Sequence, residues 1–178
     1  MSLDELERLF DAAVSSVFRL ETLPVYSIAE EADLIADFLA GRPLPDWTPA
    51  NHDLFRQIAD DTAAGKRWQR VHVVDRPLTD YLRYELAVYR YGAAAGEDIR
   101  IADRDAHPDL DGLREDFWLF DDQTLALMRY DGEGRFLGVD LASGDVDLDE
   151  YRRRRDVALA HSVPLDAYVT AHREPRSA

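Results

Sequence analysis

The chain has 178 residues, with 36 acidic and 21 basic side chains and a formal net charge of −15. It contains no cysteine, which excludes disulfides, cysteine-ligated metals and thiol nucleophiles. The length favours one domain, which we place at residues 1–172, followed by a disordered tail over 173–178. The charged, amphipathic start and the lack of a long apolar run predict a soluble, cytoplasmic protein with no membrane contact.

The excess of negative charge has consequences for possible partners. It repels phosphate, so we expect no direct binding to nucleic acid. A basic protein is the partner that such a surface favours, although solubility alone also explains an acidic composition.

The first part of the chain predicts helices that alternate with strands. Ser2 and Glu5 have the spacing of a capping box, and apolar residues at helical spacing follow them. The alternation over 18–23 predicts a strand, and a second capping box predicts a helix from Ser27 to about Ala40.

A helix, a glycine and a strand follow in the next segment. Thr48 and Pro49 predict a helix start, Gly65 suits a left-handed cap at the helix end, and residues 68–74 predict a strand. This order indicates an α/β sheet rather than a helical bundle.

The next helix carries one carboxylate in an apolar stripe. Leu78, Tyr81, Leu82, Leu86 and Tyr89 recur at helical spacing, and Glu85 lies among them. A buried carboxylate needs a partner, and we expect an arginine such as Arg114 to supply it. A short strand over 97–102 follows.

The stretch from Asp116 to Asp122 is the most distinctive in the chain. Four large apolar residues, 117–120, stand between carboxylates and predict a strand covered on both faces. Tight turns then join it to strands over 124–130 and 135–141. A final helix with a run of four arginines, 152–155, follows Asp147, and we interpret this run as a solvated, ion-paired face.

No motif predicts a cofactor or a metal. The carboxylates over 145–149 are spaced as in a calcium loop, but the glycine that such a loop needs at its sixth position is missing, which favours helix capping. His72 is expected to be a hydrogen-bonded core or edge residue, and no serine stands in a nucleophile elbow.

What remains is a group of carboxylates, arginines and aromatic residues on the helix after Pro77 and around the strand over 117–120. It forms either a candidate pocket or a buried ion-pair network that fixes the packing. Its members are Asp80, Tyr81, Arg83, Tyr84, Glu85, Arg114, Asp116, Trp118, Asp121 and Asp122.

Six segments carry a resemblance that runs over nearly the whole chain. They are Arg19-Leu-Glu-Thr, Ala64-Gly-Lys-Arg-Trp-Gln-Arg-Val, Leu78-Thr-Asp-Tyr-Leu-Arg-Tyr-Glu-Leu-Ala, Ala95-Gly-Glu-Asp-Ile-Arg, Asp116-Phe-Trp-Leu-Phe-Asp-Asp and Gly134-Arg-Phe-Leu-Gly. Together they resemble an actinobacterial family of domains of unknown function, often encoded beside helix-turn-helix regulators of the Xre type. The resemblance implies an accessory role in transcription regulation and no established activity.

The order of elements is also similar to one half of the phospholipase D fold. Active members of that superfamily carry His-x-Lys and then, after four intervening residues, Asp. With Asp121 as the aspartate, Asp116 stands at the lysine position and Arg114 at the histidine position. A carboxylate there would repel phosphate, so this resemblance implies that phosphodiesterase chemistry is absent.

The sequence therefore predicts a single α/β domain with a mixed central sheet flanked by helices. We expect a non-enzymatic accessory protein that binds a basic DNA-binding regulator. The alternatives are a small-ligand-binding protein or enzyme that uses the candidate pocket, including a degenerate phospholipase-D-like phosphodiesterase, and a homodimer that pairs through the first helix.

Overall fold

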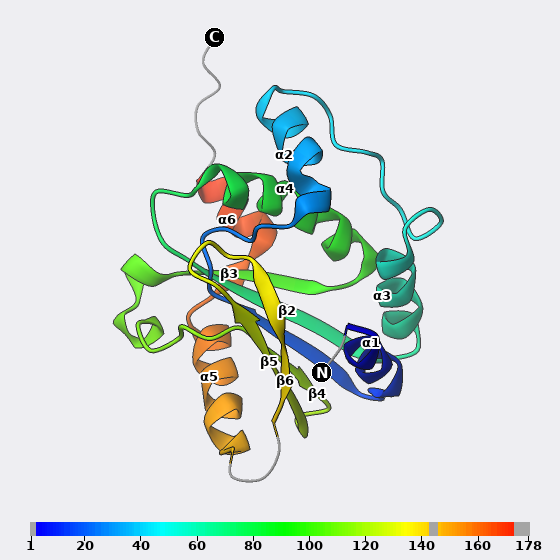
Figure 1. The fold of residues 1–178 in the computed structure, drawn as a ribbon, viewed down its shortest axis with the longest axis vertical. Helices are drawn as coiled ribbons and strands as arrows, with labels where there is room; N and C mark the ends of the chain where they lie inside the picture. The colour runs from blue at the N-terminus through cyan, green and yellow to red at the C-terminus, as the bar shows by residue number, and fades with distance from the viewer. Residues whose placement is uncertain (1–2, 143–145, 173–178) are drawn as a thin grey trace.

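A mixed, seven-stranded sheet forms the centre of the molecule (Figure 1). The computed structural model describes residues 3–142 and 146–172. The strands are β1 (Ser16–Glu21), β2 (Arg67–Val74), β3 (Asp98–Asp103), β4 (Phe117–Phe120), β5 (Thr124–Tyr130), β6 (Phe136–Leu141) and β7 (Val163–Pro164). Their order is β6-β5-β4-β1-β2-β3-β7. Strands β1, β2 and β3 are parallel and the other pairs are antiparallel, which confirms the predicted α/β fold with a mixed sheet.

Helices cover both faces of this sheet. They are α1 (Leu3–Ala12), α2 (Ala32–Leu39), α3 (Asp53–Ala63), α4 (Asp80–Ala95), α5 (Leu148–Ala160) and α6 (Leu165–Ala171), with short 3-10 turns at η1 (Ala29–Glu31), η2 (Arg104–Ala106) and η3 (Pro108–Leu110). Helices α1 and α3 pack on one face and α5 on the other, while α6 packs against α4 and β3. No helix in the described ranges is long and apolar enough to cross a membrane.

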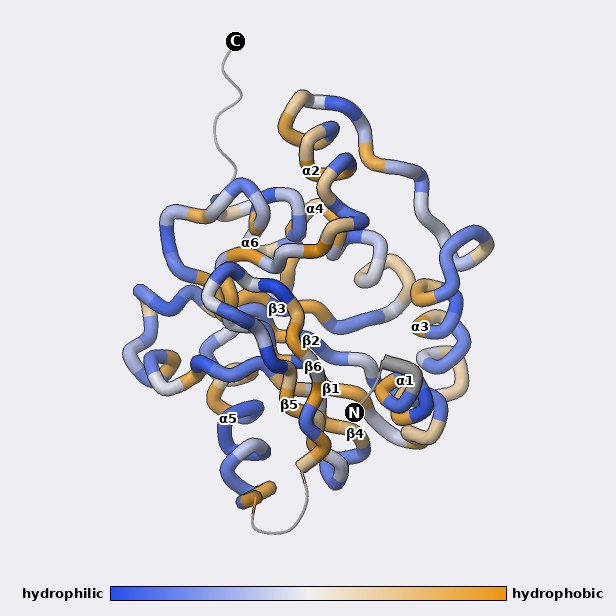
Figure 2. The backbone as a smooth tube through the Cα atoms, viewed as in Figure 1, coloured by the Kyte–Doolittle hydropathy of each residue, from blue (hydrophilic) through white to orange (hydrophobic). Residues whose placement is uncertain are grey.

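The predicted burial of β4 on both faces is confirmed. All four residues of β4 are buried. Phe117 and Leu119 pack into the core under α5, whereas Trp118 and Phe120 face the core under α1 and α3. Figure 2 shows β4 as largely hydrophobic and α5 as largely hydrophilic, which fits a surface helix laid over one face of the sheet.

Helix α4 is fixed at both ends by its own sequence. The Thr79 hydroxyl accepts a hydrogen bond from the Leu82 amide at 3.1 Å and so caps the first turn. Gly96 ends the helix in the left-handed region, at φ +113°, where glycine is unstrained. These two caps set the rotation of α4 over the sheet, with Tyr84 and Tyr89 buried beneath it.

Several predicted boundaries differ from the structure. Helix α3 begins at Asp53, not at Thr48, because the Asn51 side chain accepts from the Thr48 amide and closes a separate turn, after which His52 is extended. Strand β1 begins at Ser16, two residues before the predicted start. The cap at Ser2, the first carboxylate of the calcium-like spacing and the tail over 173–178 lie outside the described residues.

Candidate functional site

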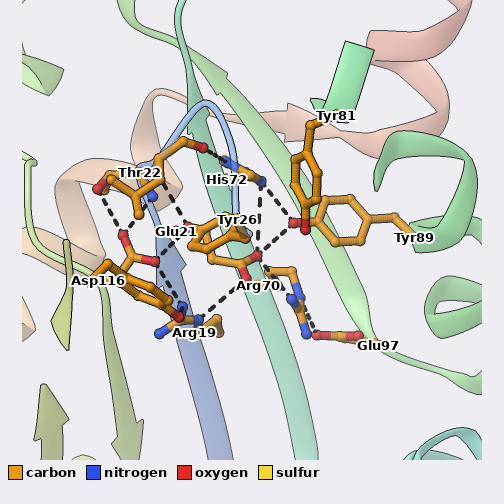
Figure 3. Close-up of polar contacts among 12 residues, drawn as sticks. Arg19, Glu21, Thr22, Tyr26, Arg70, His72, Tyr81, Tyr89, Glu97 and Asp116 are labelled. Carbon is orange, nitrogen blue, oxygen red and sulfur yellow. Dashed lines mark hydrogen bonds and ion pairs between the residues drawn. The ribbon is translucent and has the colours of Figure 1, made fainter. Parts of the chain in front are cut away.

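The site begins with charged residues that alternate along two parallel strands. Arg19 and Glu21 lie on β1, and Arg70 and His72 lie on β2. The register pairs the two arginines with each other and Glu21 with His72. Because side chains two apart in a strand share a face, all four project toward α4 near the carboxyl ends of β1 and β2 (Figure 3).

Glu21 is the centre of the network. Its carboxylate accepts from Arg70 Nη1 at 2.9 Å and from the Tyr89 hydroxyl at 2.6 Å, and Arg19 Nε lies 3.4 Å away. Burial acts to raise the pKa of Glu21, but Arg70 and Arg19 outweigh it and hold the pKa below its usual value. Glu21 is therefore an ionised carboxylate inside the protein.

Asp116 forms the second half of the network, at the start of β4. It accepts from Arg19 Nη2 at 2.8 Å, from the Tyr26 hydroxyl at 2.5 Å and from the amide and hydroxyl of Thr22 at 2.9 and 2.8 Å. Burial lowers the pKa of Arg19, but Asp116 and Glu21 raise it above its usual value. Four contacts satisfy Asp116 and leave it no role as a free acid or base.

His72 makes a hydrogen bond at each ring nitrogen. Its Nε2 lies 3.0 Å from the Leu23 carbonyl oxygen, which only accepts. Its Nδ1 lies 2.8 Å from the Tyr89 hydroxyl oxygen, and the proton of that hydroxyl is donated to Glu21. Nε2 therefore donates to the Leu23 carbonyl, and the two hydrogen bonds fix the orientation of the ring. Nδ1 also lies 3.9 Å from the Glu21 carboxylate, so the ring is part of the network.

A cavity of about 330 Å³ opens beside this network, between η1, α3 and α4. Its lining is acidic and aromatic. It comprises Glu30, Glu31, Leu34, Trp47, His52, Leu54, Phe55, Arg70, Tyr84, Glu85, Val88, Tyr89, Gly92, Glu97 and Ile99. The volume lies in the range of sites for small molecules.

Glu85 is the titratable group at the wall of this cavity. Burial, and then the negative charge of Glu21, raise the pKa of Glu85 to about 7, although His72 and the Tyr81 hydroxyl act to lower it. Burial also raises the pKa of Glu31. The carboxyl of Glu85 is consequently half protonated near neutral pH, which is the range in which a proton can be exchanged with a bound molecule.

Arg70 does not neutralise these cavity carboxylates. Its guanidinium is shared between Glu21 and Glu97, each at 2.9 Å, and lies over the Tyr89 ring at 5.2 Å. Among the described residues, no basic side chain forms an ion pair with Glu31 or Glu85. The open side of the site is therefore negative.

The structure brings part of the candidate group together. Tyr81, Tyr84 and Glu85 lie on α4 beside the network, and Asp116 lies within it. Trp118 packs below it, with the Arg19 guanidinium 5.2 Å from the centre of its ring. Of these residues, Tyr84 and Glu85 line the cavity, whereas Asp116 is buried and paired.

The other members of the group lie elsewhere. Asp80 and Arg83 are exposed on α4, 3.5 Å apart. Asp122 pairs with Arg155 on α5. Arg114 donates to the Asp111 carbonyl oxygen at 3.1 Å, so the expected pairing of Glu85 with Arg114 is wrong.

Asp121 has an architectural role. Its carboxylate accepts from the amides of Val14, Ser15 and Ser16 at 2.7 to 2.9 Å and from the Ser15 hydroxyl at 2.8 Å. Although burial acts in the opposite direction, these amides lower the pKa of Asp121 below its usual value. The residue thus anchors the turn between α1 and β1, at the opposite end of β4 from Asp116.

Sequence reasoning missed the strand residues that build the network, namely Arg19, Glu21 and Arg70. The available signal was a pair of polar residues two positions apart in each of two predicted strands, Arg19 with Glu21 and Arg70 with His72. It also missed Tyr26 and Glu97, which lie in connections without any distinctive pattern.

The fold and the cavity define a single-domain α/β protein with a small-molecule-sized site above a buried ion-pair network. The described ranges contain no group of three or more side chains placed to hold a metal ion. The chain belongs to the family described as Domain of unknown function (DUF6879), whose model matches residues 4–170. A search of curated proteins gives no match.

Proposed function

We propose that this protein binds a small organic cation, such as a substituted ammonium ion, in the cavity beside Glu85. The observation that carries the proposal is the pattern of ion pairs. Arg70 forms ion pairs with Glu21 and Glu97, so Glu31 and Glu85 face the cavity without a described basic side chain paired to them. A bound ammonium group would supply the missing positive charge.

Aromatic residues on the walls support the same ligand chemistry. His52 stacks on Phe55 with ring centres 4.3 Å apart, and Trp47 meets the His52 and Tyr91 rings edge-on at 5.8 and 5.3 Å. Aromatic faces attract an organic cation by about 0.5 to 2 kcal/mol each. An aromatic and acidic cavity favours an ammonium ion with alkyl substituents over a strongly hydrated metal ion.

Binding is expected to depend on pH through Glu85. A cation favours the ionised carboxylate, so it must displace the proton that Glu85 carries below pH about 7. Affinity should rise with pH up to about 7 and then level off, with release of up to one proton per ligand below this range. The same exchangeable proton makes Glu85 the acid–base group if the bound molecule is a substrate.

The test compares choline with 3,3-dimethylbutan-1-ol, a neutral molecule of the same shape. Calorimetry at pH 6 and pH 8 should show saturable binding of choline, tighter at pH 8, and much weaker binding of the alcohol. Glu85→Gln should weaken choline binding by about tenfold and remove most of its pH dependence. Glu133→Gln, on the exposed β5–β6 turn, is the matched control. Equal binding of both molecules, or no binding of choline, would contradict the proposal.

A protein partner is a second candidate function, and the edge strand β6 supports it. Among the described strands β6 pairs only with β5, and Phe136, Leu137 and Leu141 are exposed along it, Leu137 at 66 %. An open strand edge with apolar side chains can accept a strand from another chain. With a net charge of −15, the favoured partner is a basic protein, such as a helix-turn-helix regulator.

Affinity capture from a lysate tests this second candidate at low and high salt. A basic DNA-binding protein retained only at low salt, and lost with Leu137→Asp, would support it. Leu39→Asp, at a half-exposed apolar position at the end of α2, is the control. Light scattering at two concentrations distinguishes a second copy of this chain from a different partner. Capture that is unchanged by Leu137→Asp would contradict a role for β6.

A further inference from the structure

A second cavity, of about 360 Å³, lies on another side of α4 and has walls of different chemistry. It is bounded by α4, α6 and the segment that precedes α4. Its apolar walls are formed by Pro77, Leu78, Leu86, Ala87, Tyr168 and Val169. We refer to it as the α4–α6 cleft.

The charge around the α4–α6 cleft is the reverse of that of the whole molecule. Arg76, Arg83, Arg90 and His172 line it, and no acidic residue is among the described residues that do so. The chain as a whole carries 36 acidic against 21 basic residues. Among the described lining residues the charged side chains are therefore all basic or titrate as bases, which is a local exception in an acidic chain.

Two of these arginines, Arg76 and Arg90, are weakly engaged by the described residues. Arg76 lies 3.9 Å from Asp103 and 3.4 Å from the Tyr168 hydroxyl, both at the limit of a contact. Arg90 is exposed, and no described carboxylate forms an ion pair with it. Arg104, by contrast, binds Asp75 at 3.0 Å and two carbonyl oxygens, which shows how this chain secures a structural arginine.

The distance between two arginines on α4 indicates the length of the cleft. Arg83 and Arg90 are seven residues apart, which places them two helical turns, or about 10 Å, from each other. Leu86 and Ala87 lie between them. The end near Arg76 and Arg83 is also the N-terminal end of α4, whose dipole favours negative charge.

We propose that the α4–α6 cleft binds a small amphipathic carboxylate. The apolar body lies against Leu86, Ala87 and Val169, and the carboxylate meets Arg90 at the border of the cleft. The site is separate from the cavity beside Glu85, and its ligand has the opposite charge.

Octanoate is the probe, with 1-octanol as the neutral molecule of similar length and acetate as the anion without an apolar body. Calorimetry at low salt should give saturable binding of octanoate, at least about tenfold tighter than that of octanol, and none of acetate. Arg90→Ala should weaken octanoate binding by about fivefold to tenfold. Arg67→Ala, at an exposed arginine at the start of β2, is the matched control and should bind octanoate as the unmodified protein does.

A second variant tests the cavity independently of charge. Ala87→Phe adds a ring inside the cleft and should abolish octanoate binding while leaving Arg90 in place. Glu85→Gln should leave octanoate binding unchanged, which separates this proposal from the cation site. Three results would overturn the proposal: octanoate does not bind saturably, octanol binds equally well, or octanoate still binds to both Arg90→Ala and Ala87→Phe.

Discussion

Replacing Glu85 by glutamine should stabilise the protein at high pH and leave its stability almost unchanged at low pH. Glutamine keeps the size of the side chain and its contact with Tyr81, but it never ionises. In the folded protein the pKa of Glu85 rises from 4.5 to about 7, which corresponds to about 3 kcal/mol. The folded state therefore holds the Glu85 proton more tightly than the unfolded state does.

The direction of the pH dependence follows from this difference. Between pH 4.5 and about 7 the unfolded chain has lost the proton while the folded protein retains it, so the contribution of Glu85 to stability falls as pH rises. Above pH 7 the folded protein carries a half-buried charge beside Glu21, and the cost of about 3 kcal/mol is complete. His72 and Arg70, which face the same carboxylate, are present in both proteins and cancel in the comparison.

Urea unfolding of the unmodified protein and of Glu85→Gln, at pH 5 and at pH 8, measures this effect. The variant should be more stable by less than about 1 kcal/mol at pH 5 and by about 3 kcal/mol at pH 8, so the difference should grow by about 2 to 3 kcal/mol, or about 5 to 10 °C in melting temperature. Glu133→Gln should show no such divergence. A stability difference that is the same at both pH values would refute the reasoning, because it would come from packing rather than from ionisation.

Three further changes test the framework of the site. Asp116→Ala should lower the free energy of unfolding by about 3 to 5 kcal/mol, measured with urea, because it leaves Arg19 buried without its main partner. The double variant Arg19→Met with Asp116→Leu removes both charges and should recover much of that loss. Asp121→Ala should cost about 1 to 2 kcal/mol at pH 7, and because its pKa is lowered the difference should shrink as pH falls below 4. Gly134→Ala should lower the melting temperature, because φ is +77° at this position and a Cβ would lie 2.2 Å from a carbonyl oxygen of the loop after β1. Gly112→Ala is the control and should leave the melting temperature unchanged, because a Cβ there meets no other atom within 4 Å.

The elements that were predicted correctly are those with a strong local signal. Four consecutive large side chains fit only a strand covered on both faces, and the structure buries all of 117–120. Thr79 and Gly96 mark the ends of α4 through local hydrogen bonding and backbone conformation. Glu85 was found for a similar reason, because one carboxylate in an apolar helical stripe is visible in the sequence alone.

A buried ion-pair network with Asp116 was one of the two predicted alternatives, but Arg19, Glu21 and Arg70 were not predicted as its members, because these charges lie where a sequence indicates solvent. In β1, Arg19 and Glu21 alternate with apolar residues, a pattern typical of a strand with one wet face. The structure covers that face with helices, and it repeats the arrangement on β2, so the charges neutralise one another across the strand pair. Whether the polar side chains of a strand face solvent or pair with other charges depends on contacts between segments about fifty residues apart. A local sequence pattern does not predict such contacts.

Helix α4 separates the two proposed sites, and its geometry makes them independent. Successive residues on a helix are rotated by about 100°, so Arg83 and Arg90 lie on a different side from Glu85. The helix thus presents a carboxylate to an acidic, aromatic cavity and arginines to a basic, apolar cleft. An organic cation that binds the acidic cavity is repelled by the basic cleft, and a carboxylate that binds the basic cleft is repelled by the acidic cavity. Variants in one site should therefore change the affinity for one class of ligand only, and a loss of both affinities would indicate a disturbance of α4 itself.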